Sequence, residues 1–254
     1  MKLVLFDLDN TLLSGDSDYE WAQFLIDVGV LDRTEYEARN QEFYAAYQAG
    51  TLNIQEFLDF QLKPLSLYPR AQLDAWHERF MQEKIRPMMS AQARALVEEF
   101  SGNLIVVVTA TNSFITRPIV SEFGIQNLIA TEPEEKEQQF TGSVNGIPSF
   151  REGKVKRVKA WLESLGLSLS SFDETLFYSD SINDLPLLEM VDRPVVVDPD
   201  PKLKEHASKL GWEQLTLHRC CCAEHVDRFD FAENILGGFG VCRFSTRLRC
   251  VREY

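Results

Sequence analysis

Apolar residues along the chain fall into short runs that each end in acidic or hydroxyl side chains. The four runs are Leu3 to Asp9, Asn103 to Thr111, Thr175 to Asp184 and Arg193 to Asp200. An unbroken apolar run bounded by polar residues is typical of a strand buried on both faces of a parallel sheet. In sheets of this kind, ligands bind where the strands end. The pattern therefore predicts a parallel sheet whose polar chemistry is gathered at one edge.

Stretches with helical periodicity separate these runs. They cover Asn112 to Phe123, Lys154 to Leu165 and Pro201 to Leu210. The alternation of strand and helix predicts helices on both faces of the sheet, as in a doubly wound, Rossmann-like α/β fold. Extended runs around Asn145 and Gly146 also predict a small β-hairpin, because Asn-Gly favours a type I′ turn.

The segment between the first two predicted strands is too long for an ordinary connection. Residues 16–85 show apolar spacings of three and four, interrupted by glycine and proline, so we expect a helical insertion there. Its place directly after the first strand suits a cap that covers the site. We accordingly assign residues 1–15 and 86–218 to a Rossmann-like catalytic core and residues 16–85 to a helical cap.

Residues 219–254 differ from the rest of the chain, and we assign this C-terminal extension no role. All five cysteines lie there, so the body of the protein has no disulfide framework. Three of them are adjacent and, with His218 and His225, could hold a soft metal; a reactive exposed thiol is another possibility. Adjacent cysteines fit poorly around one tetrahedral ion, so an accessory extension, or one from a shifted reading frame, is favoured.

The chain is strongly acidic, with a formal net charge of −13. Such a surface repels phosphate backbones and anionic lipids, so we expect neither nucleic acid nor a membrane as partner. No apolar run reaches the roughly 20 residues needed to span a bilayer. Asp7 and Asp9 interrupt the short apolar run at the N-terminus, which is unlike a secretory signal. We expect a cytoplasmic protein whose partner is a small molecule.

Asp7 and Asp9 follow the first apolar run directly, where an unpaired carboxylate is costly to bury. Attack on phosphorus needs an anionic oxygen in line with the leaving group, and the leaving alkoxide needs a proton donor. Two carboxyl groups two residues apart can divide these tasks between them. The alternative is that both serve only as metal ligands, or that they are surface acids.

The sequence "FDLDNTLL" resembles the first motif of the haloacid dehalogenase superfamily, and three further motifs follow in the family's order. They are Thr109 in "VVVTATN", Lys154 in "REGKVKR", and Asp180 with Asp184 in "FYSDSINDLP". The resemblance spans about residues 1–217. The helical insertion is similar to the caps of subfamily IB, the branch that contains the phosphoserine phosphatases.

This resemblance implies a Mg²⁺-dependent phosphatase that forms an aspartyl-phosphate. Asp7 would be the nucleophile. Asp9 would protonate the leaving oxygen and then activate water. Mg²⁺ would be bound by the carboxylates of Asp7 and Asp180 and by the backbone carbonyl of Asp9. The substrate would be a small phosphorylated metabolite.

The remaining motif residues would bind the phosphate or support those that do. Thr109, Lys154 and Asn183 would contact the phosphoryl oxygens, and Asp184 would orient Lys154 or a metal-bound water. Each has a simpler interpretation when taken alone. Thr109 could bond to backbone, Lys154 could be solvated on a helix, and Asp180 and Asp184 could simply favour a helix N-terminus.

Substrate choice depends on the cap. In phosphoserine phosphatases, an acidic residue nine positions after the nucleophile holds the substrate amine, and here that position is Asp16. An ungapped alignment through "AGTLNIQEFLDF" puts Asp59 where those enzymes have an arginine for the substrate carboxylate. We therefore expect Asp16 and Asp59 to favour a cationic amino-alcohol phosphate such as histidinol phosphate. In the alternative, Asp59 faces solvent and another cap residue binds the substrate.

The second motif also departs from the phosphoserine phosphatases, because Ala110 and Thr111 stand where two glycines are expected. It is similar instead to bacterial relatives described as histidinol-phosphatase-like or phosphatidylglycerophosphatase-like. A phosphoserine phosphatase, a phosphotransferase of the same fold and a phosphometabolite-binding protein without turnover remain as alternatives. The intact set of catalytic residues argues against the last, and a dehalogenase would need neither Asp9 nor a Mg²⁺ site.

Overall fold

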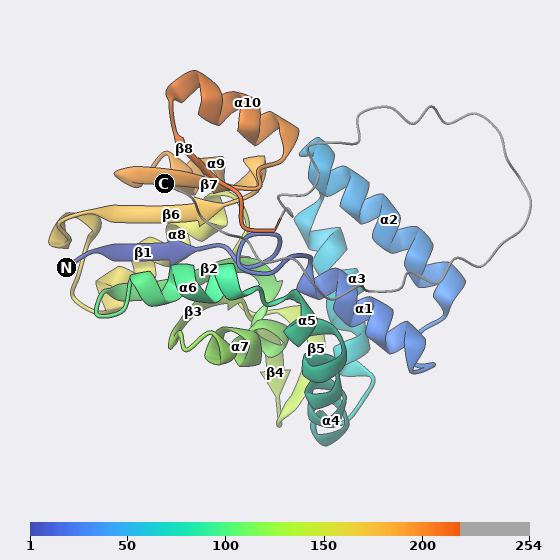
Figure 1. Ribbon diagram of the computed structural model, residues 1–254. Helices are drawn as coiled ribbons and strands as arrows, with labels where there is room; N and C mark the ends of the chain where they lie inside the picture. The colour runs from blue at the N-terminus through green and yellow to red at the C-terminus, as the bar shows by residue number, and fades with distance from the viewer. Residues whose placement is uncertain (219–254) are drawn as a thin grey trace, which may run out of the picture. The chain divides into compact units, whose positions relative to one another are not determined.

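The computed structural model describes residues 1–218, so the C-terminal extension at 219–254 lies outside the described residues. Its centre is a sheet of six parallel strands in the order β3-β2-β1-β6-β7-β8 (Figure 1). The strands are β1 (Leu3–Phe6), β2 (Leu104–Asn112), β3 (Asn127–Thr131), β6 (Thr175–Ser179), β7 (Arg193–Val197) and β8 (Glu213–Leu215). The predicted α/β fold is confirmed.

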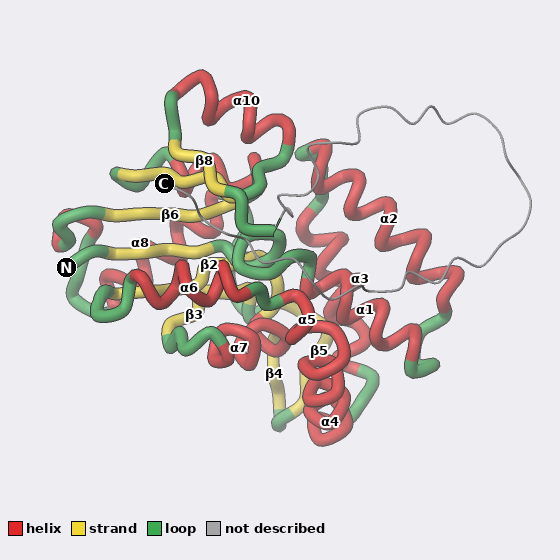
Figure 2. Tube along the Cα trace, viewed as in Figure 1, coloured by secondary structure: helices red, strands yellow, loops and turns green. Residues whose placement is uncertain are grey.

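Helices cover both faces of this sheet, as the tube in Figure 2 shows. Successive residues of β1 point to opposite faces, and all four are fully buried. Val4 and Phe6 belong to the apolar cluster that includes α6 and α7, whereas Leu3 and Leu5 belong to the cluster with α8, α9 and α10. These helices are α6 (Ala91–Glu99), α7 (Ser113–Glu122), α8 (Glu152–Ser164), α9 (Leu185–Leu188) and α10 (Pro201–Leu210).

Four helices occupy the segment between β1 and β2. They are α1 (Ser17–Asp27), α2 (Arg33–Ala49), α3 (Ile54–Ser66) and α4 (Arg70–Phe80), after which a π-helical turn, Met81–Ile85, and α5 (Arg86–Met88) lead back to the sheet. Side chains of Asp16, Asp32 and Asn53 cap the N-termini of α1, α2 and α3. Phe43 of α2 packs edge-on against Phe57 of α3, with ring centroids 5.3 Å apart. In Figure 1, α1, α2 and α3 lie beyond the carboxyl end of β1.

The small hairpin is present, but its turn is not where the sequence suggested. Its strands are β4 (Pro133–Lys136) and β5 (Gln139–Val144). Glu137 and Gln138 form the turn, with φ angles of 51° and 63°, although neither is Asn or Gly. Asn145 and Gly146 follow β5 instead and begin the irregular segment that leads to α8. The expected turn position was wrong because the partner of β5 precedes it rather than follows it.

No helix within residues 1–218 is long and apolar enough to cross a membrane.

Candidate active site

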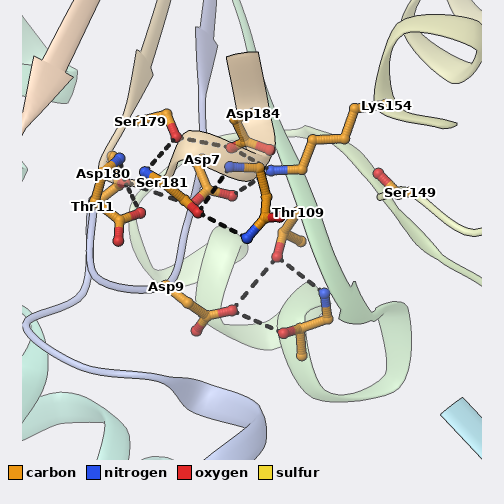
Figure 3. Close-up of polar contacts among 12 residues, drawn as sticks. Asp7, Asp9, Thr11, Thr109, Ser149, Lys154, Ser179, Asp180, Ser181 and Asp184 are labelled. Carbon is orange, nitrogen blue, oxygen red and sulfur yellow. Dashed lines mark hydrogen bonds and ion pairs between the residues drawn. The ribbon is translucent and has the colours of Figure 1, made fainter. Parts of the chain in front are cut away.

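The strand order brings the predicted motif residues to one edge of the sheet. Asp7 and Asp9 follow β1, Thr109 lies in β2, and Asp180 follows β6. Because β2, β1 and β6 are adjacent and parallel, their carboxyl ends meet at the same edge. Lys154 reaches this edge from the first turn of α8 (Figure 3).

Lys154 is buried between two carboxylates. Its Nζ donates to Asp7 Oδ1 at 2.8 Å and to Asp184 Oδ2 at 2.7 Å. Burial alone would lower the pKa of Lys154, but the charges of Asp184 and Asp7 raise it above its usual value, so the ammonium is retained. Ser179 Oγ also donates to Asp184 Oδ2, at 2.8 Å. Asp184 is thus fixed on one side of the lysine and Asp7 on the other.

Burial raises the pKa of Asp7 to about 7, and Lys154 opposes this rise. The same cause raises the pKa of Asp9 to about 6, with the charge of Asp16 adding to it. Both carboxyl groups therefore depend on nearby donors or cations to remain ionised at neutral pH.

Asp9 points to donors on both sides. Its Oδ1 accepts the backbone N–H of Ser17 at 2.6 Å. Its Oδ2 accepts the hydroxyl of Thr111 at 2.8 Å, and that of Thr109 lies 3.5 Å away. Asp9 therefore faces β2 and the start of α1, whereas Asp7 faces α8. The two acids follow one strand but occupy different environments (Figure 3).

Asp7 and Asp180 converge on a shared hydroxyl. Thr11 Oγ1 lies 3.5 Å from Asp7 Oδ2 and 3.2 Å from Asp180 Oδ1. Burial raises the pKa of Asp180 well above its usual range, and the charges of Asp7 and Asp184 raise it further. Mutually repelling carboxylates with hard oxygen donors are suited to a divalent cation such as Mg²⁺.

No three acidic, histidine or cysteine side chains among residues 1–218 form a metal-binding group by themselves. The carboxylates of Asp7 and Asp180, which lie on either side of the Thr11 hydroxyl, supply the hard oxygen donors that fit Mg²⁺.

A cavity opens above Asp7 and Asp9, which are both among its lining residues. Its catalytic floor includes Asp7, Asp9, Thr109, Thr111, Lys154 and Asp184. The helical segment supplies its opposite wall, which we call the cap wall: Asp16, Asp18, Tyr19, Asn40, Phe43, Tyr44, Tyr47, Leu52, Ile54, Phe57 and Gln61. Among the lining residues in the described part of the chain, Lys154 is the one lysine or arginine, and it is engaged by Asp7 and Asp184.

The two predicted specificity residues lie in different places. Asp16 lines the cavity; its Oδ1 accepts the N–H groups of Asp18 and Tyr19, and burial raises its pKa. Asp59 is exposed, accepts a hydrogen bond from Gln55 at 2.8 Å and is not a lining residue. Helical periodicity explains the difference, because the lining positions of α3 are spaced by three and four residues and Asp59 falls between them. The structure thus corrects the expectation that Asp59 reaches the substrate.

Asn183 is buried but also lies outside the cavity lining. Its amide nitrogen donates to the carbonyl of Tyr47 at 3.1 Å, at the C-terminal end of α2. Arg151 donates to the Asn183 side-chain oxygen and to the carbonyl of Gly50. Lys202 Nζ donates to the carbonyl of Ala49 at 2.8 Å. In this structure Asn183 thus holds the end of α2 rather than facing the space where a phosphate would bind.

Backbone geometry at the start of α8 fixes the position of Lys154. Arg151, which precedes the helix, has a φ of 50°. A Cβ at Gly153 would lie 2.1 Å from the carbonyl oxygen of Pro148, so only glycine allows this close approach. The chain therefore turns sharply and places Lys154 in the first turn of the helix.

Several functional groups were not singled out from the sequence. Thr111 follows Thr109 by two positions on the same strand, so period-two alternation alone could have identified it. Thr11 lies within the quoted first motif, four positions after Asp7. Asn40 and Gln61 carry no local signal, because only tertiary packing of α2 and α3 brings them to the cavity.

Comparison with known proteins agrees with this arrangement. Residues 4–189 match the family of haloacid dehalogenase-like hydrolases. A histidinol-phosphatase of Neisseria meningitidis serogroup C (strain 8013) is 45% identical over 217 residues, covering 84% of this chain and 98% of that protein.

Solved structures share the fold. A protein of unknown function from Bordetella pertussis Tohama I has a TM-score of 0.80 and 47% identity, covering 84% of this chain and 97% of that one. A substrate-bound phosphoserine phosphatase has a TM-score of 0.61 at 20% identity, covering 86% of this chain and 93% of that one. At this level of identity the likeness shows a shared fold alone. The chain therefore belongs to the haloacid dehalogenase-like hydrolases.

Proposed function

We propose that this phosphatase hydrolyses the phosphate ester of a cationic amino alcohol, with histidinol phosphate as the first candidate. The charge of the cavity lining carries this proposal. The cap wall has two carboxylates, Asp16 and Asp18, and no lysine or arginine. A substrate ammonium group would be attracted there. The carboxylate of phosphoserine would be repelled there, and within residues 1–218 the lining offers it no lysine or arginine besides Lys154, which is engaged by Asp7 and Asp184.

The 45% identical histidinol-phosphatase supports the same choice, because its similarity extends over nearly its whole length. The phosphoserine phosphatases are more distant; one from Methanocaldococcus jannaschii is 23% identical. Their arginine for the substrate carboxylate has no equivalent in this cavity lining. Phosphoserine is therefore the competing substrate against which the proposal is tested.

Asp7 is proposed as the nucleophile that forms an aspartyl-phosphate. Lys154 holds its Oδ1 and leaves Oδ2 on the side of Thr11 and Asp180. Lys154 also supplies positive charge beside the phosphoryl group, where negative charge is spread over the transition state. Mg²⁺ bound by Asp7, Asp180 and the Asp9 carbonyl would supply further compensating charge to the phosphate. Asp184 keeps Lys154 in position.

Asp9 is proposed as the general acid and base. Its separate hydrogen bonds to Ser17 and Thr111 hold it apart from Asp7, on the cap side of the floor. There it can give a proton to the leaving alcohol and later take one from the attacking water. Thr109, which is buried beside it, is placed to bond a phosphoryl oxygen when substrate is present.

The helical segment is proposed to act as a cap over this reaction. Asp16 stands at the start of α1 and is the carboxylate best placed to receive the amine near the ester. The contacts of Asn183, Arg151 and Lys202 with the end of α2 hold the cap wall over the catalytic floor. Closure would exclude water until the phosphate is in place.

The test is phosphate release from histidinol phosphate, phosphoethanolamine and phosphoserine, each with Mg²⁺ and with chelator. We expect Mg²⁺-dependent release, with kcat/KM highest for histidinol phosphate and lowest for phosphoserine. Asp7→Asn serves as the control for contaminating phosphatase and should abolish release. A preference for phosphoserine would refute the proposed substrate class. Release that survives in Asp7→Asn would refute the assigned nucleophile.

A further inference from the structure

Two polar atoms on the cap wall have no hydrogen-bond partner within residues 1–218. They are Asp18 Oδ1 and Asn40 Nδ2. Both side chains line the cavity, and they are only 5% and 3% exposed. Buried polar groups are nearly always paired, and an unpaired carboxylate is especially costly. A ligand that enters the cavity and bonds to both would remove this cost.

Helices α1, α2 and α3 together position these two groups. Asp18 lies in the first turn of α1, and Asn40 lies near the middle of α2. Gln61 of α3 donates its amide to Asn40 Oδ1 at 3.4 Å. The acceptor of Asn40 is thereby occupied and its donor remains free. The cap wall thus offers one carboxylate acceptor and one amide donor, both positioned before a ligand arrives.

The surroundings of this pair are aromatic. Phe43 and Phe57 line the same cavity and contact each other edge to face. Aromatic side chains favour flat rings, which can stack on them or meet their edges. A ligand that bears both a donor and an acceptor on one flat ring would match the polar pair and the aromatic wall together.

We propose that Asp18 and Asn40 form a subsite for a nitrogen heterocycle carried by the substrate. The Asp18 carboxylate accepts a hydrogen bond from the ring N–H, and the Asn40 amide donates to the unprotonated ring nitrogen. A neutral imidazole has this combination, whereas an indole lacks the acceptor and a phenyl ring lacks both groups. This subsite rests on the proposed function. The subsite extends the proposed function, because Asp16 would bind the ammonium group of any amino-alcohol phosphate, whereas Asp18 and Asn40 would select an ester that carries the heterocycle.

Kinetics of two variants and a matched control test the subsite. Asp18→Asn and Asn40→Leu should each raise KM for histidinol phosphate about tenfold or more, with kcat changed less than about twofold. Hydrolysis of phosphoethanolamine, which has an amine but no ring, should not change in Asn40→Leu, and in Asp18→Asn it should fall less than hydrolysis of histidinol phosphate, because Asp18 also adds to the negative charge of the cap wall. Asp59→Asn makes the same chemical change at the exposed position outside the cavity and should behave as wild type. Equal losses on both esters, or no change on either, would overturn the subsite.

Thermal unfolding separates binding from folding. Asp18→Asn should not lower the melting temperature of the ligand-free protein, because it replaces a buried acidic side chain whose Oδ1 has no hydrogen-bond partner within residues 1–218 with a neutral amide. If Asp18→Asn nevertheless fails to fold, Asn40→Leu supplies the same kinetic test with an apolar side chain of similar size.

Titration calorimetry with histidinol itself needs no turnover. If histidinol phosphate proves a poor substrate but histidinol binds wild type and not Asp18→Asn, the subsite stands and the proposed substrate fails. If histidinol phosphate is hydrolysed best but both proteins bind histidinol equally, the substrate stands and the subsite fails. Lack of binding to wild type also overturns the subsite.

Discussion

Replacing Lys154 with methionine tests the electrostatic balance at the catalytic floor. The ammonium group lies 2.8 Å from Asp7 Oδ1 and 2.7 Å from Asp184 Oδ2, and the side chain is 3% exposed. Methionine preserves most of the volume but leaves two buried carboxylates without their cation. Removing one partner of a buried ion pair typically costs about 3–5 kcal/mol. We expect the free energy of unfolding of the metal-free protein to fall by about that amount at pH 8.

The loss should depend on pH in a definite direction. The folded-state pKa of Asp7 is raised to about 7 by burial, against an unfolded value of 3.8, and Lys154 opposes that rise. Without Lys154 the folded pKa rises further. A group with a raised folded pKa stabilises the protein below its unfolded pKa, and that contribution is lost as pH rises through the folded pKa. The penalty of Lys154→Met should therefore be smaller at pH 5 than at pH 8.

Urea unfolding followed by circular dichroism, in the presence of chelator, measures this penalty. Lys159→Met is the matched control, because Lys159 lies on the same helix and is exposed. Its effect should stay within about 0.5 kcal/mol. If Lys154→Met costs no more than Lys159→Met at pH 8, or costs more at pH 5 than at pH 8, the assignment of Lys154 as the necessary counter-charge is wrong.

Three further predictions concern other parts of the site and the cap. Gly153→Ala should destabilise the protein by about 1–3 kcal/mol, because its Cβ would lie 2.1 Å from the Pro148 carbonyl oxygen; an unchanged melting temperature would contradict this. Thr111→Val should lower kcat about tenfold by removing the 2.8 Å hydrogen bond to Asp9, and an unchanged kcat would show that Asp9 does not need it. His77 is buried, which lowers its pKa. The contribution of His77 to stability should therefore fall as pH drops below about 6.5, where the unfolded histidine takes up a proton first. His77→Asn should remove this part of the pH dependence of the melting temperature, and parallel curves for the two proteins would contradict it.

The sequence allowed the centre of the fold to be predicted but not its edges. Strand β1 was recognisable because its four residues are buried on both faces and are therefore all apolar. Strands β3 and β8 were not anticipated, since each lies at an edge of the sheet, where burial imposes less pattern. The hairpin turn at Glu137 and Gln138 lacks the residues that usually mark a positive φ.

The candidate site, like the fold, could be predicted only in part. Asp7, Asp9 and Asp180 could be found because each lies within three residues of the end of a strand, where chain order fixes spatial position. Residues of the cap wall depend on how helices pack, which local sequence does not determine. Asp18 was overlooked because an acid in the first turn of a helix usually needs no explanation beyond the helix dipole. Asp59 was misplaced because the ungapped alignment carried no information about which side of α3 faces the cavity.

Three of the bonds that hold the end of α2 are made through its main chain. Asn183, Lys202 and Arg151 donate to the carbonyls of Tyr47, Ala49 and Gly50, and none of these bonds uses a side chain of α2. Every amino acid offers the same carbonyl, so these three bonds do not depend on which side chains α2 carries, whereas the contacts of Tyr47 with Phe150 and Ser181 use its side chain. Side chains of α2 that line the cavity, such as Asn40 and Phe43, can therefore be exchanged without removing these three bonds, so substrate preference can change while the main-chain attachment of α2 stays the same.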